Sequence, residues 1–296
     1  MNGRSATKPP WTEHPRVHAI RQRSPAIDVG VQTLDAYNRH RSGRNAALIA
    51  HFGFVSIFPL VLALTTTLGF VLRDRPDLQE DIIDSALSRV PIIGQTIGTD
   101  PAELKGSAAV LAFGLLAALW SGLRAFVAVQ FALDDVREVP REARPNYAVM
   151  RVRALTGVAV IGGSQLATAI ITAIVGAASF TTINRMLLAL GVLGVNVLAV
   201  CLTFRWLCSS PTTWRRVLPG ALTAGVLFSA MQFVGTTVVA RLIANASPVY
   251  GTFASVIGLI TWLSLHAMVA LFAAELNEVL HRRRVDSPTV ALHVAT

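Results

Sequence analysis

The chain has 296 residues, of which 53% are apolar and 15% are charged, and its formal net charge is +9. A soluble domain of this length normally carries about 25% charged residues, and several apolar runs here exceed the ~18 residues that a membrane helix needs. This composition excludes an ordinary soluble protein. It predicts an all-α, polytopic membrane protein with six transmembrane helices.

The N-terminal region lacks an apolar core of the length that a signal peptide needs, so the first membrane helix is expected to act as the insertion signal. Residues 1–25 combine prolines with scattered arginines, which predicts a disordered cytoplasmic tail. From residue 26, apolar residues recur at helical intervals beside charged ones: Ile27, Val31, Leu34 and Tyr37. This pattern predicts a short interfacial helix along the membrane surface.

Six apolar stretches predict the membrane spans, at about 46–72, 107–133, 154–183, 186–207, 217–240 and 249–274. They form one membrane domain over residues 26–280, followed by a basic cytoplasmic tail over 281–296. Pro59 lies within the first span and is expected to kink it. The loop 73–106 holds four basic and seven acidic residues around apolar residues at four-residue steps. This pattern predicts an extracytoplasmic amphipathic helix.

The distribution of Lys and Arg predicts the orientation. Six spans place both termini on one side, and that side collects nineteen of the 26 basic residues. The opposite side has six, and Arg124 lies within a span. Because cytoplasmic loops carry the excess of Lys and Arg, both termini are expected in the cytoplasm of a bacterial inner-membrane protein.

Arg124 is the most informative single residue, because a charge within a span is rare and commonly faces the bundle interior or a water-filled cavity. It lies about 6 Å from the middle of the second span, towards the cytoplasm. One interpretation is a long side chain that reaches the headgroups or pairs with a neighbouring helix. The other is a binding site for an anionic substrate headgroup. Glu275, on the closing helix at a similar depth, is the expected ion-pair partner.

The closing helix carries polar residues on two opposite sides. His266 and Asn277 fall on one side, and Glu275 falls on the other. Two polar stripes indicate a central helix enclosed by neighbours. His266 is interpreted either as a proton relay or as a hydrogen-bonded packing residue. On the fifth span, a stripe of small residues favours close helix packing: Ala221, Gly225 and Ser229.

Motifs of soluble enzymes are absent from the sequence. There is no Gly-rich phosphate-binding loop with Lys-Ser/Thr, no His-Glu-x-x-His and no Cys-x-x-Cys, and the seven histidines are scattered. Cys201 and Cys208 are too far apart on one helix for a disulfide. We therefore expect no cofactor, no metal site, no nucleic-acid partner and no enzymatic activity.

Three stretches together resemble the YihY/BrkB family of bacterial inner-membrane proteins: "RNAALIAHFGFVSIFPLVLAL" at 44–64 with Pro59, "WRRVLPGALTAGVLF" at 214–228 with Gly220, and "YGTFASVIGLITWLSLHAMVALFAAELNEVL" at 250–280, which opens with Tyr250 and Gly251. Asp134 stands where the family commonly has Asn, whereas Glu142, Arg144 and Pro145 resemble its acidic-Arg-Pro stretch. Some members carry the label ribonuclease BN. For relatives, the resemblance implies transport of envelope lipids or export of small molecules.

The leading hypothesis is a transporter, exporter or flippase-like protein for an amphipathic anionic molecule such as an envelope lipid precursor. Its expected substrate-binding residues are Arg124, Glu275, His266 and Asn277. The alternative is a membrane scaffold or regulator without transport activity, and a membrane-bound ribonuclease is disfavoured because the sequence offers no metal-ligand set. Membrane lipids, anionic ones in particular, are the expected partners, and assembly into a homo-oligomer stays open.

Overall fold

The computed structural model describes residues 21–22, 24–71, 108–176, 182–210, 212–244 and 251–286. Its regular elements are all helices: α2 (Pro25–Arg39), α3 (Ser42–Val71), α6 (Ala108–Val136), the short 3-10 helix η3 (Arg141–Ala143), α7 (Tyr147–Gly176), α8 (Thr182–Trp206), α9 (Trp214–Ala244) and α10 (Gly251–Val285). The all-α prediction is confirmed for these residues. The expected helix in 73–106, Tyr250 and most of both predicted tails lie outside them.

Six long helices, α3 and α6 to α10, correspond to the six predicted spans. Three of them contain a stretch that is long and apolar enough to cross a membrane: Ala112–Val136, Ala189–Trp206 and Val256–Val285. This comparison covers only the described residues. The chain therefore has at least three helices that qualify as spans by length and composition, and six crossings stay a prediction.

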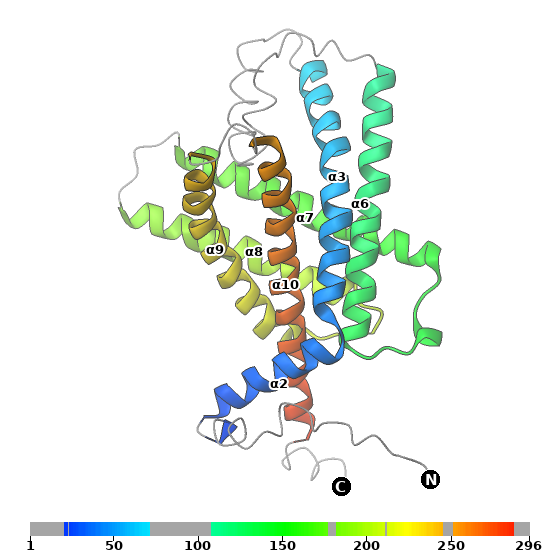
Figure 1. The fold of residues 1–296 in the computed structure, drawn as a ribbon, viewed down its shortest axis with the longest axis vertical. Coiled ribbons are helices and arrows are strands. Elements are labelled where there is room, and N and C mark those ends of the chain that lie inside the picture. The colour runs from blue at the N-terminus through cyan, green and yellow to red at the C-terminus, as the bar shows by residue number, and fades with distance from the viewer. Residues whose placement is uncertain are drawn as a thin grey trace.

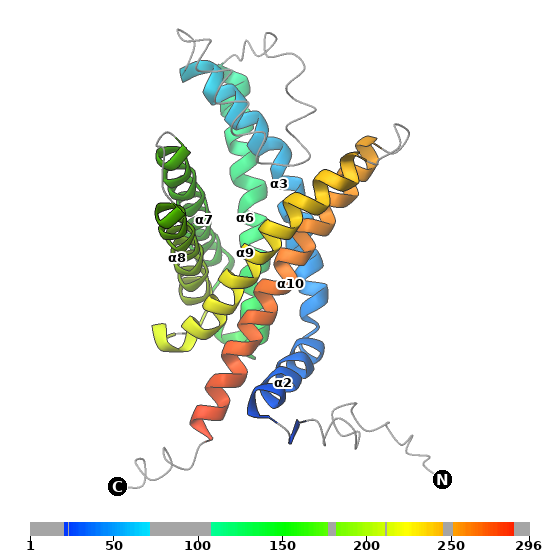
Figure 2. The ribbon, with the colours of Figure 1, turned by 90° about the vertical axis from the view of Figure 1, so that its left-hand side faces the viewer.

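The six long helices pack in a closed circuit. Each helix contacts the next along the chain from α6 to α10, and α10 contacts α3, which packs on α6. In Figure 1, α10 runs through the middle, with α9 on one side and the α3–α6 pair on the other. Figure 2 shows α9 beside α10 and α7 beside α8, with the two pairs diverging away from α2. The end of the bundle near α2 is called the base here.

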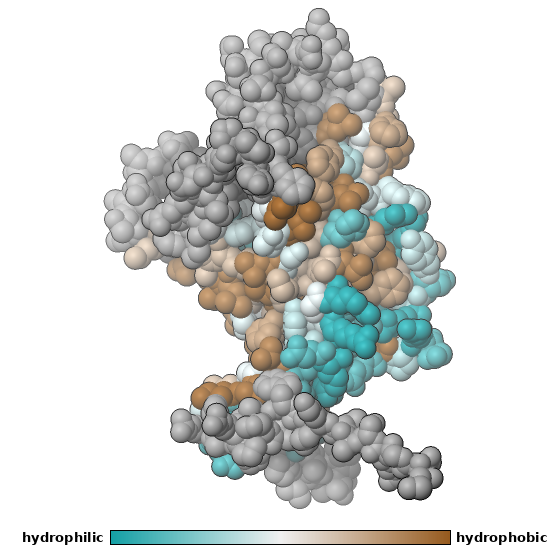
Figure 3. Space-filling model, in the orientation of Figure 1, coloured by the Kyte–Doolittle hydropathy of each residue, from teal (hydrophilic) through white to brown (hydrophobic). Residues whose placement is uncertain are grey.

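The packed core lies near the base, where the helices converge. Its largest cluster joins the C-terminal ends of α6 and α8 to the start of α9 and to Ala273 and Ala274 of α10. Further from the base, the helices expose large apolar side chains, such as Phe113 and Leu190. Hydrophilic side chains gather on the side that carries η3 and the start of α7 (Figure 3). Exposed apolar helices above a polar base are what a surrounding lipid bilayer requires.

α2 is a docked helix at the base, and it begins one residue before the predicted start. Ser24 caps it by accepting from the backbone N–H of Ala26, and Pro25 occupies its first turn. Asp28 binds Arg21 (2.5 Å) and Arg283 of α10. Ion pairs therefore tie the predicted interfacial helix to the end of α10.

Several helix ends differ from the predicted spans by a few residues, and the largest differences at ends flanked by described residues are in α7 and α10. α7 begins at Tyr147 rather than near residue 154, and α10 continues to Val285 rather than ending near residue 274. In both extensions the charged side chains have partners on neighbouring elements: Arg153 donates to the carbonyl of Cys208, and Glu278 pairs with Arg216. The segment predicted as the start of a basic tail, residues 281–285, is thus the last turn of α10.

Candidate functional site

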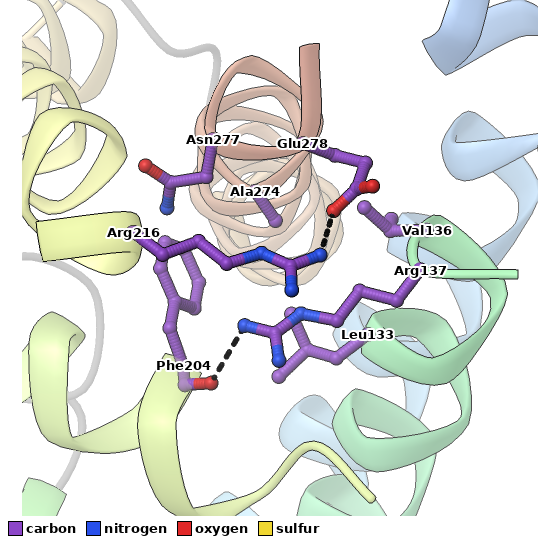
Figure 4. Close-up of a pocket in the computed structure, with 8 residues that line it drawn as sticks. All are labelled: Leu133, Val136, Arg137, Phe204, Arg216, Ala274, Asn277 and Glu278. Atoms are coloured by element: carbon purple, nitrogen blue, oxygen red, sulfur yellow. Dashed lines mark hydrogen bonds and ion pairs between the residues drawn. The ribbon is translucent and has the colours of Figure 1, made fainter. Parts of the chain in front are cut away.

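A small pocket at the base is formed by four helices and holds two arginines. It is lined by side chains from the C-terminal ends of α6 and α8, the start of α9 and the last turns of α10: Leu133, Val136, Arg137, Phe204, Arg216, Ala274, Asn277 and Glu278 (Figure 4). Its volume of about 10 Å³ has room for one water molecule. We call it the arginine pocket.

The two arginine side chains enter the arginine pocket from opposite sides and extend past each other, Arg216 towards Glu278 and Arg137 towards Phe204 (Figure 4). Arg216 forms an ion pair with Glu278, which also accepts from Arg282 at 3.1 Å. Arg137 instead donates to neutral oxygens: the carbonyl of Phe204 (3.4 Å), both oxygens of Ser210 (3.2 and 3.3 Å) and the hydroxyl of Thr212. Within the lining, two cations thus share a single carboxylate.

Asn277 joins α9 to α10 beside this pocket. Its Oδ1 accepts from the backbone N–H of Gly220 at 2.6 Å, and its Nδ2 donates to the carbonyl of Val217 at 3.1 Å. A Cβ atom at Gly220 would overlap the carbonyl oxygen of Ala273 and the amide of Asn277. The glycine therefore lets the two helices approach closely enough for both hydrogen bonds to form.

Glu275 lies in a different cluster, which we call the His40 clamp. Its carboxylate is 0% exposed and accepts from Nδ1 of His40 (2.9 and 3.0 Å) and from the hydroxyl of Ser42 (2.8 Å). Nε2 of His40 lies 3.1 Å from Glu138, which follows α6 with a left-handed backbone (φ 53°). Both ring nitrogens face carboxylates, so the imidazolium form suits this position.

The charges of the His40 clamp reinforce one another. The hydrogen bond to Glu275 raises the pKa of His40, burial opposes this shift, and Glu138 adds to it. The hydrogen bond from His40 lowers the pKa of Glu138, and Arg282 lowers it further. The clamp thereby fastens the α2–α3 connection to α10 and to the end of α6.

Arg124 and Glu275 are not brought together, and their predicted ion pair is wrong. Arg124 is exposed on the outer face of α6, with its guanidinium carbon 5.5 Å from the ring centroid of Trp120. Glu275 is enclosed by His40 and Ser42. A similar depth along two helices does not determine the faces on which their side chains lie, and here those faces differ.

His266 lies among aromatic side chains halfway along α10. Its Nδ1 is 2.9 Å from the carbonyl oxygen of Trp262, and its ring stacks on Phe228 at a centroid distance of 5.2 Å. The structure gives it no titratable hydrogen-bond partner among the described residues. This environment favours the packing interpretation over the proton relay.

Asp134 has a clear structural role at the end of α6. It is fully buried and accepts from the backbone N–H of Ser209 (2.8 Å), from the hydroxyl of the same residue (2.6 Å) and from the thiol of Cys208 (3.4 Å). Arg144, from the acidic-Arg-Pro stretch, reaches Asp135 at 2.8 Å. These carboxylates fasten the connections that follow α6 and α8.

In the part of the chain that the structure describes, no three His, Cys, Asp or Glu side chains form a metal-binding group.

The sequence model of the family described as virulence factor BrkB matches residues 33–294, which is most of the chain. The chain belongs to the BrkB family. This BrkB-family chain is 29% identical to an uncharacterized protein of Dickeya dadantii (strain 3937), over 87% of the chain and 84% of the relative. It is 25% identical to the inner membrane protein YhjD of Escherichia coli (strain K12), over 86% and 81%.

A third relative is the putative ribonuclease-like protein YfkH of Bacillus subtilis (strain 168), at 23% identity over 86% of the chain and 95% of the relative. No solved structure gives a significant match. Its apolar helices and its family make the chain an integral, multi-pass inner-membrane protein.

Of the expected site residues, Asn277 alone lines the arginine pocket of this BrkB-family protein. Sequence reasoning missed His40, Arg137, Arg216 and Glu278. The three charged pocket residues stand next to predicted span ends, where a charge is unremarkable. One signal was available for Glu278. No helix-breaking residue separates it from the long apolar stretch before it, so the helix could be expected to continue through it.

Proposed function

We propose that this protein binds an amphipathic molecule by its anionic headgroup and moves it within or across the membrane, with the arginine pocket as the headgroup-binding element. The observation that carries the proposal is the pair of arginines in one pocket with a single carboxylate, at the boundary between the polar base and the apolar helices. A phosphate or carboxylate between them would neutralise the excess positive charge. Arginine suits this role because its planar group binds such anions with two parallel hydrogen bonds.

The position of the pocket fits an amphipathic ligand better than a small soluble anion. The base provides charged and hydrogen-bonding groups, whereas the same helices expose apolar side chains away from it. A headgroup at the base would leave acyl chains beside the apolar surfaces that face lipid. The hydrophobic effect then adds to the affinity without further polar contacts.

The conformation described here is closed, since the pocket has room for one water molecule. Transport therefore requires a second conformation in which α9 separates from α10 or from the end of α6. The Arg216–Glu278 ion pair and the two hydrogen bonds of Asn277 are the contacts that such a motion would break. A bound anion can take the place of Glu278 on Arg216, which would couple binding to opening.

Reconstitution of the full chain into phosphatidylcholine liposomes tests the proposal. Fluorescent phosphatidylglycerol and phosphatidylcholine are placed in both leaflets, and the fraction accessible to an impermeant reductant is followed over time. We expect the protein to accelerate movement of the anionic lipid, and Arg137→Gln or Arg216→Gln to slow it on the order of tenfold, as for loss of a charge-assisted hydrogen bond. Arg215→Gln removes an exposed neighbouring charge and is the matched control.

Failure to move any member of a panel of anionic lipids would contradict transport and favour the scaffold alternative. The tight packing around the arginine pocket is the observation that suits a scaffold. If Arg215→Gln and Arg216→Gln slow lipid movement equally, the arginine pocket has no specific role in transport. For this chain we propose no ribonuclease activity, although the B. subtilis relative is named a putative ribonuclease-like protein. RNA cleavage that follows the purified protein through every column and disappears in a pocket variant would overturn that statement.

A further inference from the structure

The outer face of α6 and α7 carries two short rows of side chains at four-residue steps. On α6 the row is Leu116, Trp120 and Arg124, and on α7 it is Tyr147, Arg151 and Leu155. Residues four apart lie on one face of a helix. Trp120 is 51% exposed and Tyr147 is 55% exposed, so both rows face outward.

Arginine–aromatic contacts join the two rows. The guanidinium carbon of Arg151 lies 4.4 Å from the ring centroid of Trp120 and 4.7 Å from that of Tyr147, and Arg151 also donates to the Tyr147 hydroxyl at 3.1 Å. The guanidinium carbon of Arg124 lies 5.5 Å from the Trp120 centroid. One exposed indole thus contacts two cations.

Neither arginine has an acidic partner. No carboxylate lies within ion-pair distance of Arg124 or Arg151 among the described residues. Within the described structure, their side-chain contacts are limited to the two aromatic rings and the Tyr147 hydroxyl. Two cations on one ring repel each other and leave most of their N–H donors free. Both guanidiniums therefore have N–H donors available for an anion at this surface.

We propose that this surface binds the headgroup of an anionic glycerophospholipid from the surrounding leaflet. Arg124 and Arg151 contact the phosphate, Trp120 and Tyr147 flank it, and the acyl chains lie along the apolar ends of the two rows. This lipid site is separate from the arginine pocket and does not depend on the proposed transport.

The surroundings of the surface identify a lipid rather than free phosphate. Leu116, one turn from Trp120, is 67% exposed, and Leu155, one turn from Arg151, is 43% exposed. α7 begins just after the polar loop that carries η3, on the hydrophilic side of the molecule in Figure 3. Tyr147 and Arg151 stand at this change from polar to apolar surface, where aromatic residues mark the headgroup level of a bilayer and arginines bind anionic lipids. Trp120 and Arg124 reach the same point from the middle of the apolar stretch Ala112–Val136 of α6, through the contact between Trp120 and Arg151.

Native mass spectrometry of the full chain in detergent tests this site. The protein is titrated with phosphatidylglycerol and with phosphatidylcholine of the same acyl chains, and the bound fractions are compared. We expect the first tightly bound lipid to be phosphatidylglycerol, with a preference of about tenfold, because its phosphate receives charge-assisted hydrogen bonds without a neighbouring choline. Arg124→Gln combined with Arg151→Gln should abolish the preference, and Arg124→Lys combined with Arg151→Lys should retain part of it.

Arg141→Gln is the matched control, since it removes an exposed charge from η3 on the same side of the molecule. Trp120→Leu keeps both charges and should weaken the preference by removing the shared ring. An unchanged preference in the double Gln variant would overturn the proposal, as would an equal loss in Arg141→Gln. Displacement of the bound lipid by millimolar inorganic phosphate would show an anion site without lipid specificity and would also overturn it. In the liposome assay for transport, the double Gln variant should still move phosphatidylglycerol, so failure of this lipid site and failure of transport are distinguishable.

Discussion

His40 connects three elements through its imidazole ring. Its hydrogen bonds to Glu275 of α10 and to Glu138 after α6 hold the junction between α2 and α3. Arg39 opposes its protonation, whereas both carboxylates favour it, and the net effect raises the pKa of His40. The folded structure of the base therefore favours the protonated form of His40.

This shift predicts a fall in stability at high pH. A group with a raised pKa in the folded state stabilises the protein fully below its unfolded pKa of about 6.5, and the stabilisation is lost as the pH rises through the folded pKa. The lowered pKa values of Asp28 and Glu138 keep these groups ionised throughout that window. We expect the thermal unfolding midpoint in detergent to fall above about pH 6.5, and His40→Asn to remove most of that dependence.

His51→Asn is the control for this experiment, because His51 is exposed on α3 and has no carboxylate partner among the described residues. It should keep the pH dependence of the unmodified protein. At pH 6 we expect His40→Asn to lower the free energy of unfolding by roughly 1–3 kcal/mol, as for loss of a hydrogen bond to a charged group. A pH profile that is the same with and without His40 would contradict the clamp.

At the scale of residues, the sequence predicted which side chains are unusual better than it predicted their partners. Arg124 and Glu275 were recognised because charges in apolar stretches are rare. Their ion pair was wrong because helical periodicity places a side chain on a face of its own helix and does not say what that face contacts. The actual partner of Glu275 is His40, which is 235 positions away in the chain and which stood out in the sequence only as one of seven scattered histidines.

At the scale of elements, the α9–α10 contact depends on Gly220. Replacing Gly220 with alanine forces the new methyl group against the carbonyl of Ala273 and the side chain of Asn277. We expect a loss of about 1–3 kcal/mol in the free energy of unfolding, measured by denaturant titration. Gly191→Ala is the matched control, since a Cβ there meets nothing within 4 Å. It should be neutral or stabilise the helix by up to about 1 kcal/mol. Equal midpoints for the two variants would contradict this account of the close approach.

The docking of α2 is a weaker contact. Burial raises the pKa of Asp28, but hydrogen bonds from Arg21 and Arg283 outweigh it and lower the pKa overall. We expect Asp28→Asn to speed amide hydrogen exchange within Pro25–Arg39 a few-fold, because partly exposed ion pairs contribute about 0–1 kcal/mol. Asp35→Asn, on the same helix and without an ion pair in the described structure, should leave the exchange unchanged. Equal acceleration in both variants would mean that loss of charge, not loss of docking, loosens α2.

The positions of the elements were predictable to the extent that apolar length determines them. All six predicted spans correspond to long helices, and the largest boundary errors are at the start of α7 and the end of α10. Both errors have one cause: charged residues were assigned to water, whereas in the structure Glu278 and Arg153 bind groups on neighbouring helices and connections, and Arg151 lies against exposed aromatic rings. The circuit that joins α10 to α3 depends on contacts between distant parts of the chain, and no local pattern reveals it.

At the scale of the whole molecule, charge asymmetry and packing both indicate that the two ends of the helical bundle's chain lie on the same side. Segments that the basic-residue count assigns to one side are joined at the base by ion pairs, such as Arg282–Glu138 and Arg216–Glu278. α2 and the C-terminal end of α10 also lie at this end (Figure 1). An even number of crossings returns the chain to its starting side, whereas the three helices that qualify as spans among the described residues would alone leave the two ends on opposite sides.

Cysteine labelling in intact cells distinguishes these topologies, because the two native cysteines are buried and give little background. New cysteines are introduced near each end as Ser5→Cys and Thr289→Cys, and in the acidic loop as Asp100→Cys. With an excess of basic residues on the cytoplasmic side, an impermeant maleimide should label the loop position in intact cells and both end positions only after permeabilisation. Labelling of one end without the other would require an odd number of crossings. Labelling of both ends in intact cells would reverse the predicted orientation while keeping the even number that the shared base implies.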